Sequence, residues 1–241
     1  MKEFDKEAHN ELAKEASEKS AVLMENDRIL PLKGREKIAV VGDFAFKPRY
    51  QGAGSSIVNP IMLTTAIEEL KKSEFPAIFY CRGFERYGKK NKKLSKEAER
   101  ISGQAEVTLF FAGLDEYSEA EGIDRKDMKI PENQIEVFKD LIKAGRKVVL
   151  ILHCGSSVEL DWTEGASAIL YMGLSGQAGA SACINLLTGK ANPCGKLAET
   201  WWRKYEDCPT SDSELFPGGE DEVVYREGLF SGYRAKTKTP P

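Results

Sequence analysis

"EVTLFFAGL", residues 106–114, is a nearly continuous apolar run that contains β-branched and aromatic residues. Such a run is typical of a strand that is buried on both faces, as in a parallel sheet. Four further runs repeat the pattern: "KIAVVGDF" at 37–44, "AIFYCRG" at 77–83, "KVVLILHCG" at 147–155 and "AILYMG" at 168–173. Together they predict a mainly parallel sheet of about five or six strands.

The stretches between these runs have the spacing of amphipathic helices. Apolar residues recur every three or four positions at 60–73, 94–103, 131–144 and 176–188, and a leading helix is expected at 5–26. "PENQIEVFKDLIKAG" also has Pro131 in its first turn and Gly145 after its end, as helices prefer. This alternation predicts an α/β fold, a three-layer α/β/α sandwich. We expect a single domain over 1–241, with an irregular tail at about 190–241 that wraps the sheet.

The composition narrows the class of protein. The 241 residues are 41% hydrophobic and 30% charged, as in an ordinary globular domain. A net charge of -3 argues against a nucleic-acid partner, and the basic run at 86–96 is interpreted as a solvated turn. No hydrophobic signal core is seen, so we expect no membrane partner and a cytoplasmic location, although a lost signal peptide is left open. The five cysteines form no CxxC pair and are expected to be reduced.

Several chemistries have little support. "GAGSS" at 52–56 lacks the spacing of a dinucleotide loop, because Ile57 stands where a third glycine belongs. A serine nucleophile would need a base, and the only histidines are His9 and His153. We expect His153 to be a satisfied core residue; with Cys154 it makes a poor zinc pair, since adjacent strand residues point to opposite faces. We therefore predict no metal and no cofactor.

Carboxylate chemistry has more support. "GLDEYSEAEGIDRKDMKIPENQ", residues 113–134, follows the first run and has five carboxylates in ten positions before Arg125. A solvated loop is the ordinary explanation of such an acid run. However, ligands of open parallel sheets bind at the carboxyl ends of strands, and a glutamate that is partly desolvated there can act as a general acid. Glycoside hydrolysis needs a second carboxylate held rigidly nearby.

Seven segments, in order, resemble the second (C-terminal) α/β-sandwich domain of glycoside hydrolase family 3. They are "LAKEASEKSAVLMENDRILPL" at 12–32, "KIAVVGDFA" at 37–45, "RYQGAGSSIVNP" at 49–60, "EAEGIDRKDMKIPENQ" at 119–134, "KVVLILHCGSSVELDW" at 147–162, "GLSGQAGASACINLLTGKANPCGKLAETW" at 173–201 and "VVYREGLFSGYR" at 223–234. The resemblance covers nearly the whole chain.

This resemblance implies a role in a β-glucosidase or a related exo-acting β-glycosidase that retains configuration through a covalent glycosyl intermediate. In the family the nucleophilic aspartate belongs to a (β/α)8 barrel domain, and the acid/base glutamate belongs to the sandwich domain. "EGIDR" matches the family motif, with Ile123 in place of the usual aromatic, and implies Glu121 as the acid/base. Glu119 is the alternative. Asp124 and Arg125 are expected to pair, and Gly122 to permit the turn.

A second family loop is matched by "RYQGAGSS". There the resemblance implies that Tyr50 stacks on a sugar, with Arg49 and Gln51 as hydrogen-bonding groups; the alternative is that Arg49 and Gln51 only brace the loop. Four other aromatic residues are expected in packing rather than in sugar binding. They are Trp201, Trp202, Tyr225 and Tyr233.

A barrel needs roughly 250 residues, which the sandwich leaves no room for. We therefore expect one domain of a longer enzyme, inactive when isolated. Its expected partners are the barrel domain of the same parent enzyme and a β-linked gluco-oligosaccharide or an aryl or alkyl β-glycoside, and homo-oligomerisation is left open. The competing hypotheses are a stand-alone carbohydrate-binding or interaction module and a flavodoxin-like nucleotide binder.

Overall fold

A computed structural model describes residues 4–212, 215–219 and 221–238. Within this part of the chain, six strands form one sheet in the order β1-β6-β5-β4-β2-β3. Every neighbouring pair is parallel except β1 with β6, which is antiparallel. The strands are β1 Val22–Asn26, β2 Lys37–Val41, β3 Ala77–Cys81, β4 Val107–Gly113, β5 Val148–His153 and β6 Ala168–Tyr171.

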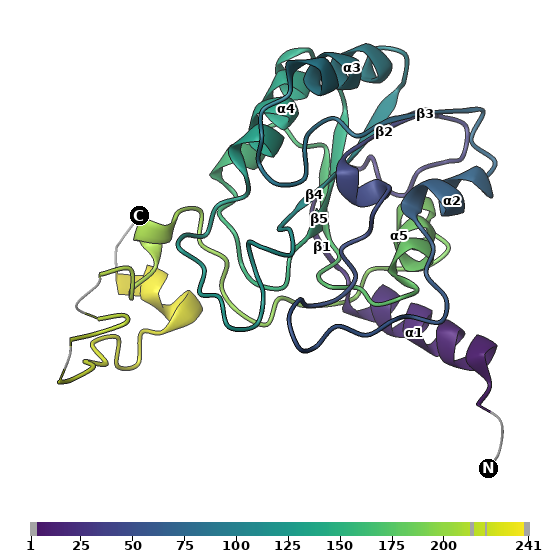
Figure 1. Ribbon diagram of the computed structural model, residues 1–241. Coiled ribbons are helices and arrows are strands. Elements are labelled where there is room, and N and C mark those ends of the chain that lie inside the picture. The colour runs from purple at the N-terminus through teal and green to yellow at the C-terminus, as the bar shows by residue number, and fades with distance from the viewer. Residues whose placement is uncertain (1–3, 213–214, 220, 239–241) are drawn as a thin grey trace.

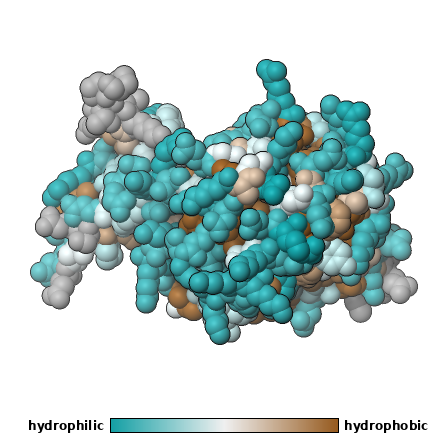
Figure 2. Space-filling model, turned by 90° about the horizontal axis from the view of Figure 1, so that it is seen from above, coloured by the Kyte–Doolittle hydropathy of each residue, from teal (hydrophilic) through white to brown (hydrophobic). Residues whose placement is uncertain are grey.

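Helices cover both faces of the sheet, so the chain is a three-layer α/β/α sandwich (Figure 1). One face is covered by α3 and α4, and the other by α1, α2 and α5. The helices are α1 Lys6–Ser20, α2 Ala66–Lys71, α3 Lys92–Ser102, α4 Glu132–Lys143 and α5 Gly179–Thr188. None of those in the described residues is both long and apolar enough to cross a membrane. The outer surface over α3 and α4 is mostly hydrophilic in Figure 2, as expected of helices that bury only one face.

The predicted central strands are confirmed. Every residue of β4 and β5 is buried, because both strands have neighbours on each side and helices above and below. On the α4 side, the ring of Phe138 contacts Phe110 and Trp162 at centroid distances of 5.6 and 5.0 Å. The continuous apolar runs therefore form the centre of the core, as their composition predicts.

The predicted helix at 5–26 is confirmed up to Ser20 and is wrong for its last six residues, 21–26. Helix α1 starts after Asp5, whose side chain accepts a hydrogen bond from the Ala8 N–H, and it ends at Ser20. Ala21 is extended, and Val22–Asn26 forms β1, an edge strand of the sheet that pairs with β6. Local spacing did not reveal this change, because the hydrogen-bond partners of β1 lie more than 140 residues later in the chain.

The predicted helix at 60–73 is shorter than expected. Helix α2 begins only after Thr65, which forms a reciprocal capping box with Glu68. The residues before it, 57–63, are neither helix nor strand, and five large apolar side chains there are exposed. They are Ile57, Val58, Ile61, Met62 and Leu63.

Parallel pairing brings the carboxyl ends of β2, β3, β4, β5 and β6 to one edge of the sheet, here called the carboxyl edge. The loops at 42–65, 82–91, 114–131, 154–160 and 172–178 all start there. After residue 190 the chain is irregular: Trp201 packs on Tyr171, and the Tyr205 N–H binds the Glu159 carboxylate. Beyond that point the described residues lie apart from the three layers (Figure 1).

Gly113, the last residue of β4, makes the closest approach between the two central strands. A Cβ at this position would lie 1.8 Å from the His153 carbonyl oxygen. Its N–H and carbonyl are both bound by the buried amide of Gln134, at 3.0 Å each. A side chain here would therefore push β4 and β5 apart.

We expect Gly113→Ala to lower the free energy of unfolding by about 3 kcal/mol, because the backbone must shift in a packed core. Gly145→Ala is the control: Gly145 lies in the turn after α4 with a φ of 70°, and no atom lies within 4 Å of its Cβ site. The control should cost about 1 kcal/mol for the strained conformation alone. Urea denaturation of both variants measures the free energy of unfolding. An equal loss of stability in the two variants would show that the close contact of Gly113 with His153 does not limit the side chain at this position.

Candidate functional site

The acid loop, residues 114–131, leaves the end of β4 at the carboxyl edge. Its first two carboxylates are bound locally or by arginine. Asp115 is buried and accepts from the N–H groups of Tyr117 and Ser118 at 2.8 and 3.0 Å. The Glu116 carboxylate accepts two hydrogen bonds from the Arg86 guanidinium, at 2.7 and 2.9 Å. The crowding of like charge is thus relieved because individual acids have separate partners.

Arg86 is itself buried and connects the acid loop to the loop that follows β2. Its Nη1 donates to the Asp43 carboxylate and to the Lys47 carbonyl, each at 3.0 Å. Its guanidinium also lies 4.3 Å from the centre of the Phe44 ring. Burial raises the pKa of Glu116, but the bonds and charge of Arg86 outweigh that effect and leave this pKa below its ordinary value.

Glu119 is held at the inner side of the loop. Its carboxylate accepts from the Gly155 N–H at 2.7 Å and from the Ser156 hydroxyl at 3.3 Å. Arg49 lies 3.8 Å away, too far for a direct hydrogen bond but close enough for ion pairing. Burial raises the pKa of Glu119 above its ordinary value, against the opposing effects of the Gly155 N–H and the arginine charge.

Glu121 lies at the tip of the loop. A turn bonded from the Ile123 N–H to the Ala120 carbonyl places Glu121 and Gly122 at its centre, and Gly122 has the positive φ of 75° that such a turn requires. The exposed carboxylate accepts through Oε2 from the Ser55 N–H at 3.0 Å and from the Ser55 hydroxyl. Its own N–H binds the Ala53 carbonyl at 3.1 Å. The loop at 52–55 therefore fixes the tip.

Arg49 and Gln51 brace the neighbouring loop, and a hydrogen-bonding role toward a sugar stays a prediction. The buried Arg49 guanidinium donates to the carbonyls of Leu114, Gln51 and Glu119. The Gln51 amide exchanges two 3.0 Å bonds with the backbone of Val58 and donates to the Tyr50 hydroxyl at 2.8 Å. Tyr50 is half-buried, and a stacking role for its ring stays a prediction.

The expected ion pair between Asp124 and Arg125 is wrong for the described residues. Arg125 instead donates to the Ser156 hydroxyl at 2.8 Å and to the Ser157 carbonyl at 2.7 Å, and Asp124 is exposed. Ser156 therefore connects Arg125 to Glu119. The prediction fails because the loop after β5 offers a hydroxyl and a carbonyl beside the guanidinium.

The other expected residues have mixed outcomes. His153 is buried between the rings of Phe44 and Phe111, and burial lowers its pKa to about 4, but its Nδ1 has no partner in the described chain. His153 is therefore a core residue, as expected, but one of its two ring nitrogens lacks a hydrogen-bond partner among the described residues. Trp202 is buried, as expected, whereas Tyr225 and Tyr233 are 85% and 71% exposed, so the expectation that these two pack is wrong.

Sequence reasoning missed the residues that support the two glutamates. Ser55, Gly155 and Ser156 bind the carboxylates, and Arg86 holds the start of the loop. A signal existed for the serines and for Gly155: "GAGSS" and "HCGSS" each follow a predicted strand. Small residues at strand ends leave backbone N–H groups accessible to anions.

A sandwich domain with a braced acid loop at its carboxyl edge has known relatives. Residues 21–233 match the sequence model of the glycosyl hydrolase family 3 C-terminal domain, and the chain belongs to this family. It is 40% identical over 237 residues to thermostable beta-glucosidase B of Acetivibrio thermocellus, a match that covers 96% of this chain and 31% of that protein. It is also 37% identical to an exo-alpha-(1->6)-L-arabinopyranosidase of Bifidobacterium breve, and this match covers 96% of this chain and 32% of that protein.

Solved structures agree with this assignment. The crystal structure of a Bifidobacterium adolescentis GH3 beta-glucosidase superposes with a TM-score of 0.88 at 38% identity, over 97% of this chain and 34% of that one. The chain thus spans about a third of the length of the relatives that it matches. It is a domain of the kind found in β-glucosidase-type glycosidases of family 3.

The buried guanidinium of Arg49 should be the main brace of this site. We expect Arg49→Met to lower the free energy of unfolding by about 3 kcal/mol, because it leaves buried carbonyls unsatisfied and Glu119 without its cation. Lys93→Met removes the same charge at an exposed position on α3 and should change stability by less than about 0.5 kcal/mol. Chemical denaturation measures both, and a similar small effect for the two would show that Arg49 is not a brace.

Proposed function

We propose that this chain is the domain of a retaining, exo-acting β-glycosidase, most simply a β-glucosidase, that supplies the general acid/base. The family membership and the β-glucosidase relatives support this proposal. The observation that carries it within the site is the placement of Glu121. Its carboxylate is exposed at the tip of a braced turn, and among the described residues only Oε2 accepts a hydrogen bond. The other oxygen can therefore reach a substrate.

In the proposed reaction, Glu121 first acts as an acid. A carboxylate of the partner domain attacks the anomeric carbon of the substrate, the glycosidic C–O bond breaks, and the Glu121 proton passes to the leaving oxygen. Glu121, now a carboxylate, then takes a proton from water as that water attacks the same carbon and releases the enzyme nucleophile. Both steps need Glu121 to face a site that this chain completes only with its partner.

Glu119 is the alternative acid/base, and its raised pKa favours that role, because a general acid must hold its proton near neutral pH. Its geometry favours a supporting role. The carboxylate is bound by Gly155 and Ser156 at the end of β5, and Arg49 lies beside it. Protonating a leaving group would require Glu119 to give up these contacts, so we assign it to positioning the loop.

The proposed partner is a (β/α)8 barrel domain of the same parent enzyme, which would supply the nucleophile. Two observations support a docking surface beside Glu121. The chain spans about a third of its relatives, and the exposed apolar segment 57–63 follows directly after Ser55, which binds Glu121. Residues 52–65 contain no charged side chain. An exposed apolar, uncharged segment of this kind is typical of an interface.

The acid/base assignment can be tested in the parent enzyme, or in this chain mixed with its barrel domain. On an aryl β-glucoside we expect Glu121→Ala to lose about 100- to 10,000-fold in turnover, the usual contribution of general acid/base catalysis. Aryl groups leave without much acid assistance, so the glycosyl intermediate still forms, and added azide should restore turnover as glycosyl azide. Kinetics with and without azide measure both effects.

Glu119→Ala is the matched control for this experiment. It should lose stability and some activity without azide rescue. Rescue of Glu119→Ala in place of Glu121→Ala would transfer the acid/base role to Glu119. Full activity of both variants would leave the loop as a solvated acid run, and the proposed function would fail.

Docking through segment 57–63 gives a separate prediction. We expect Ile61→Glu to weaken binding of the separately produced barrel domain at least about 10-fold, because a charge would be buried without a partner. Leu12→Glu, which alters an equally exposed leucine on α1, should bind normally. Sedimentation or calorimetric titration measures both. If Ile61→Glu binds normally, or if it only abolishes self-association of this chain, the segment does not face the barrel.

A further inference from the structure

Two exposed tyrosines meet beside the acid loop. Tyr87 comes from the loop after β3 and Tyr117 from the acid loop, and their ring centroids are 5.2 Å apart at an interplanar angle of 63°. They are 56% and 72% exposed. An aromatic pair of this size normally gains from burial, so a pair that stays at the surface marks a surface used for binding.

The pair stands on a rigid support. Each tyrosine follows directly after one partner of the partly buried ion pair between Arg86 and Glu116, so the two bonds of 2.7 and 2.9 Å fix the spacing of the rings. The Asp43 carboxylate accepts a hydrogen bond from Arg86, and the Asp115 carboxylate accepts one from the Tyr117 N–H. A surface preorganised in this way loses little conformational entropy when it binds a ligand.

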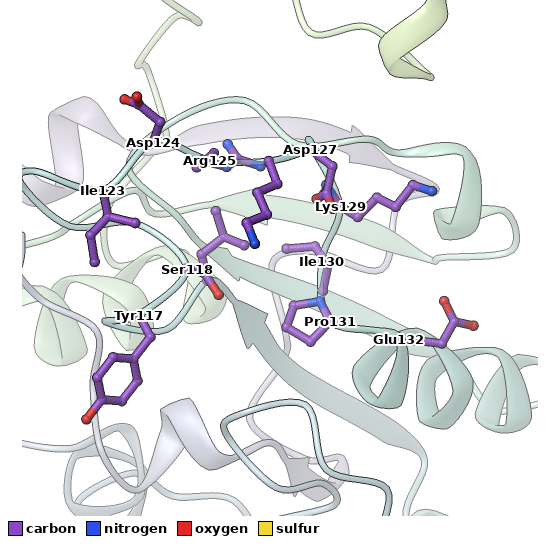
Figure 3. A pocket seen from close by; sticks show the side chains of 12 residues that line it. Tyr117, Ser118, Ile123, Asp124, Arg125, Asp127, Lys129, Ile130, Pro131 and Glu132 are labelled. Atoms are coloured by element: carbon purple, nitrogen blue, oxygen red, sulfur yellow. The ribbon is translucent and has the colours of Figure 1, made fainter.

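Two hollows adjoin the pair. Tyr117 lines one of about 430 Å³, and Tyr87 lines another of about 380 Å³. Both volumes are within the range of about 300–1,000 Å³ that ligand sites occupy. Figure 3 shows the first hollow, which is lined by Ser118, Ile123 and Ile130 and has Tyr117 at its edge. The lining of the second hollow includes Lys47, Arg82 and Lys89.

The lining of the first hollow favours a neutral, hydroxyl-rich ligand. Three acids balance three bases there, so a strongly charged ligand such as a phosphate gains no net attraction. Carboxylates accept hydrogen bonds and guanidinium and ammonium groups donate them, as a sugar with many hydroxyls requires. The acids are Asp124, Asp127 and Glu132, and the bases are Arg125, Lys126 and Lys129. The tyrosine rings offer an apolar surface for the C–H faces of a pyranose.

The first hollow also adjoins the proposed catalytic turn. Ile123, Asp124 and Arg125 line it and directly follow Gly122 of the turn that carries Glu121. We propose that the hollow and the Tyr87–Tyr117 pair bind the distal sugars of a β-linked oligosaccharide, on the leaving-group side of the bond that is cut. This inference rests on the proposed function and deepens it. It makes an oligosaccharide, rather than a short alkyl or aryl glucoside, the preferred substrate.

The test uses the parent enzyme and β-linked gluco-oligosaccharides of two to five units, with aryl β-glucoside as the reference substrate. We expect Tyr117→Ala to lower the ratio of kcat/KM for the longest oligosaccharide to kcat/KM for the aryl glucoside about 10-fold, mainly through KM. Tyr117→Phe, which keeps the ring, should retain most of the ratio. Tyr80→Ala, an exposed tyrosine of β3 that lines neither hollow, is the matched control and should leave the ratio unchanged.

The inference would be overturned if this ratio of kcat/KM values were unchanged in Tyr117→Ala. It would also be overturned if the ratio fell no further in Tyr117→Ala than in Tyr80→Ala. Binding separates this result from failure of the proposed function. Glu121→Gln in the parent enzyme should abolish turnover yet bind the tetrasaccharide as wild type does in calorimetric titration, and adding Tyr117→Ala should weaken that binding. Loss of turnover without an effect of Tyr117→Ala on binding would keep the acid/base role and reject the tyrosine platform.

Discussion

Parallel pairing of five strands constrains everything else in this domain. Because β2 to β6 run in the same direction, their carboxyl ends meet at one edge, and five loops must share that edge. The close backbone contact of Gly113 with His153 brings the loops after β4 and β5 together. Glu119 can therefore reach the Gly155 N–H at 2.7 Å although the two residues are 36 positions apart.

Two buried arginines make the crowded acid loop stable at this edge. Arg86 neutralises Glu116 and Asp43, and Arg49 lies beside Glu119 while it binds three carbonyls of two loops. Each guanidinium is almost completely buried, and a buried charge is tolerated only when it is paired and hydrogen-bonded. The acids at the base of the loop are thus held by structural contacts, whereas Glu121 at the tip is exposed and is the proposed acid/base.

The same arrangement agrees with the proposed role of this chain as one domain of a longer enzyme. The loops at the carboxyl edge carry an exposed glutamate, an uncharged apolar segment and an exposed tyrosine pair, and the chain spans about a third of the length of its relatives. A surface with these features matches a domain that closes a site against a partner. The supports are local to this domain, so the positions of the two glutamates do not require that partner.

The sequence by itself determined the central strands, because runs such as 107–113 and 148–153 are apolar enough to be buried on both faces, and it determined the helices whose capping signals are local. The resemblance of residues 121–125 to a family motif also predicted Glu121 as the acid/base, with Glu119 as the alternative. Only the tertiary structure decided which role each neighbour has. Arg125 turns to Ser156 rather than to Asp124, residues 22–26 join the sheet rather than extend α1, and Tyr87 meets Tyr117. Each of these depends on partners far away in the sequence, whose approach is set by strand pairing and not by local propensity.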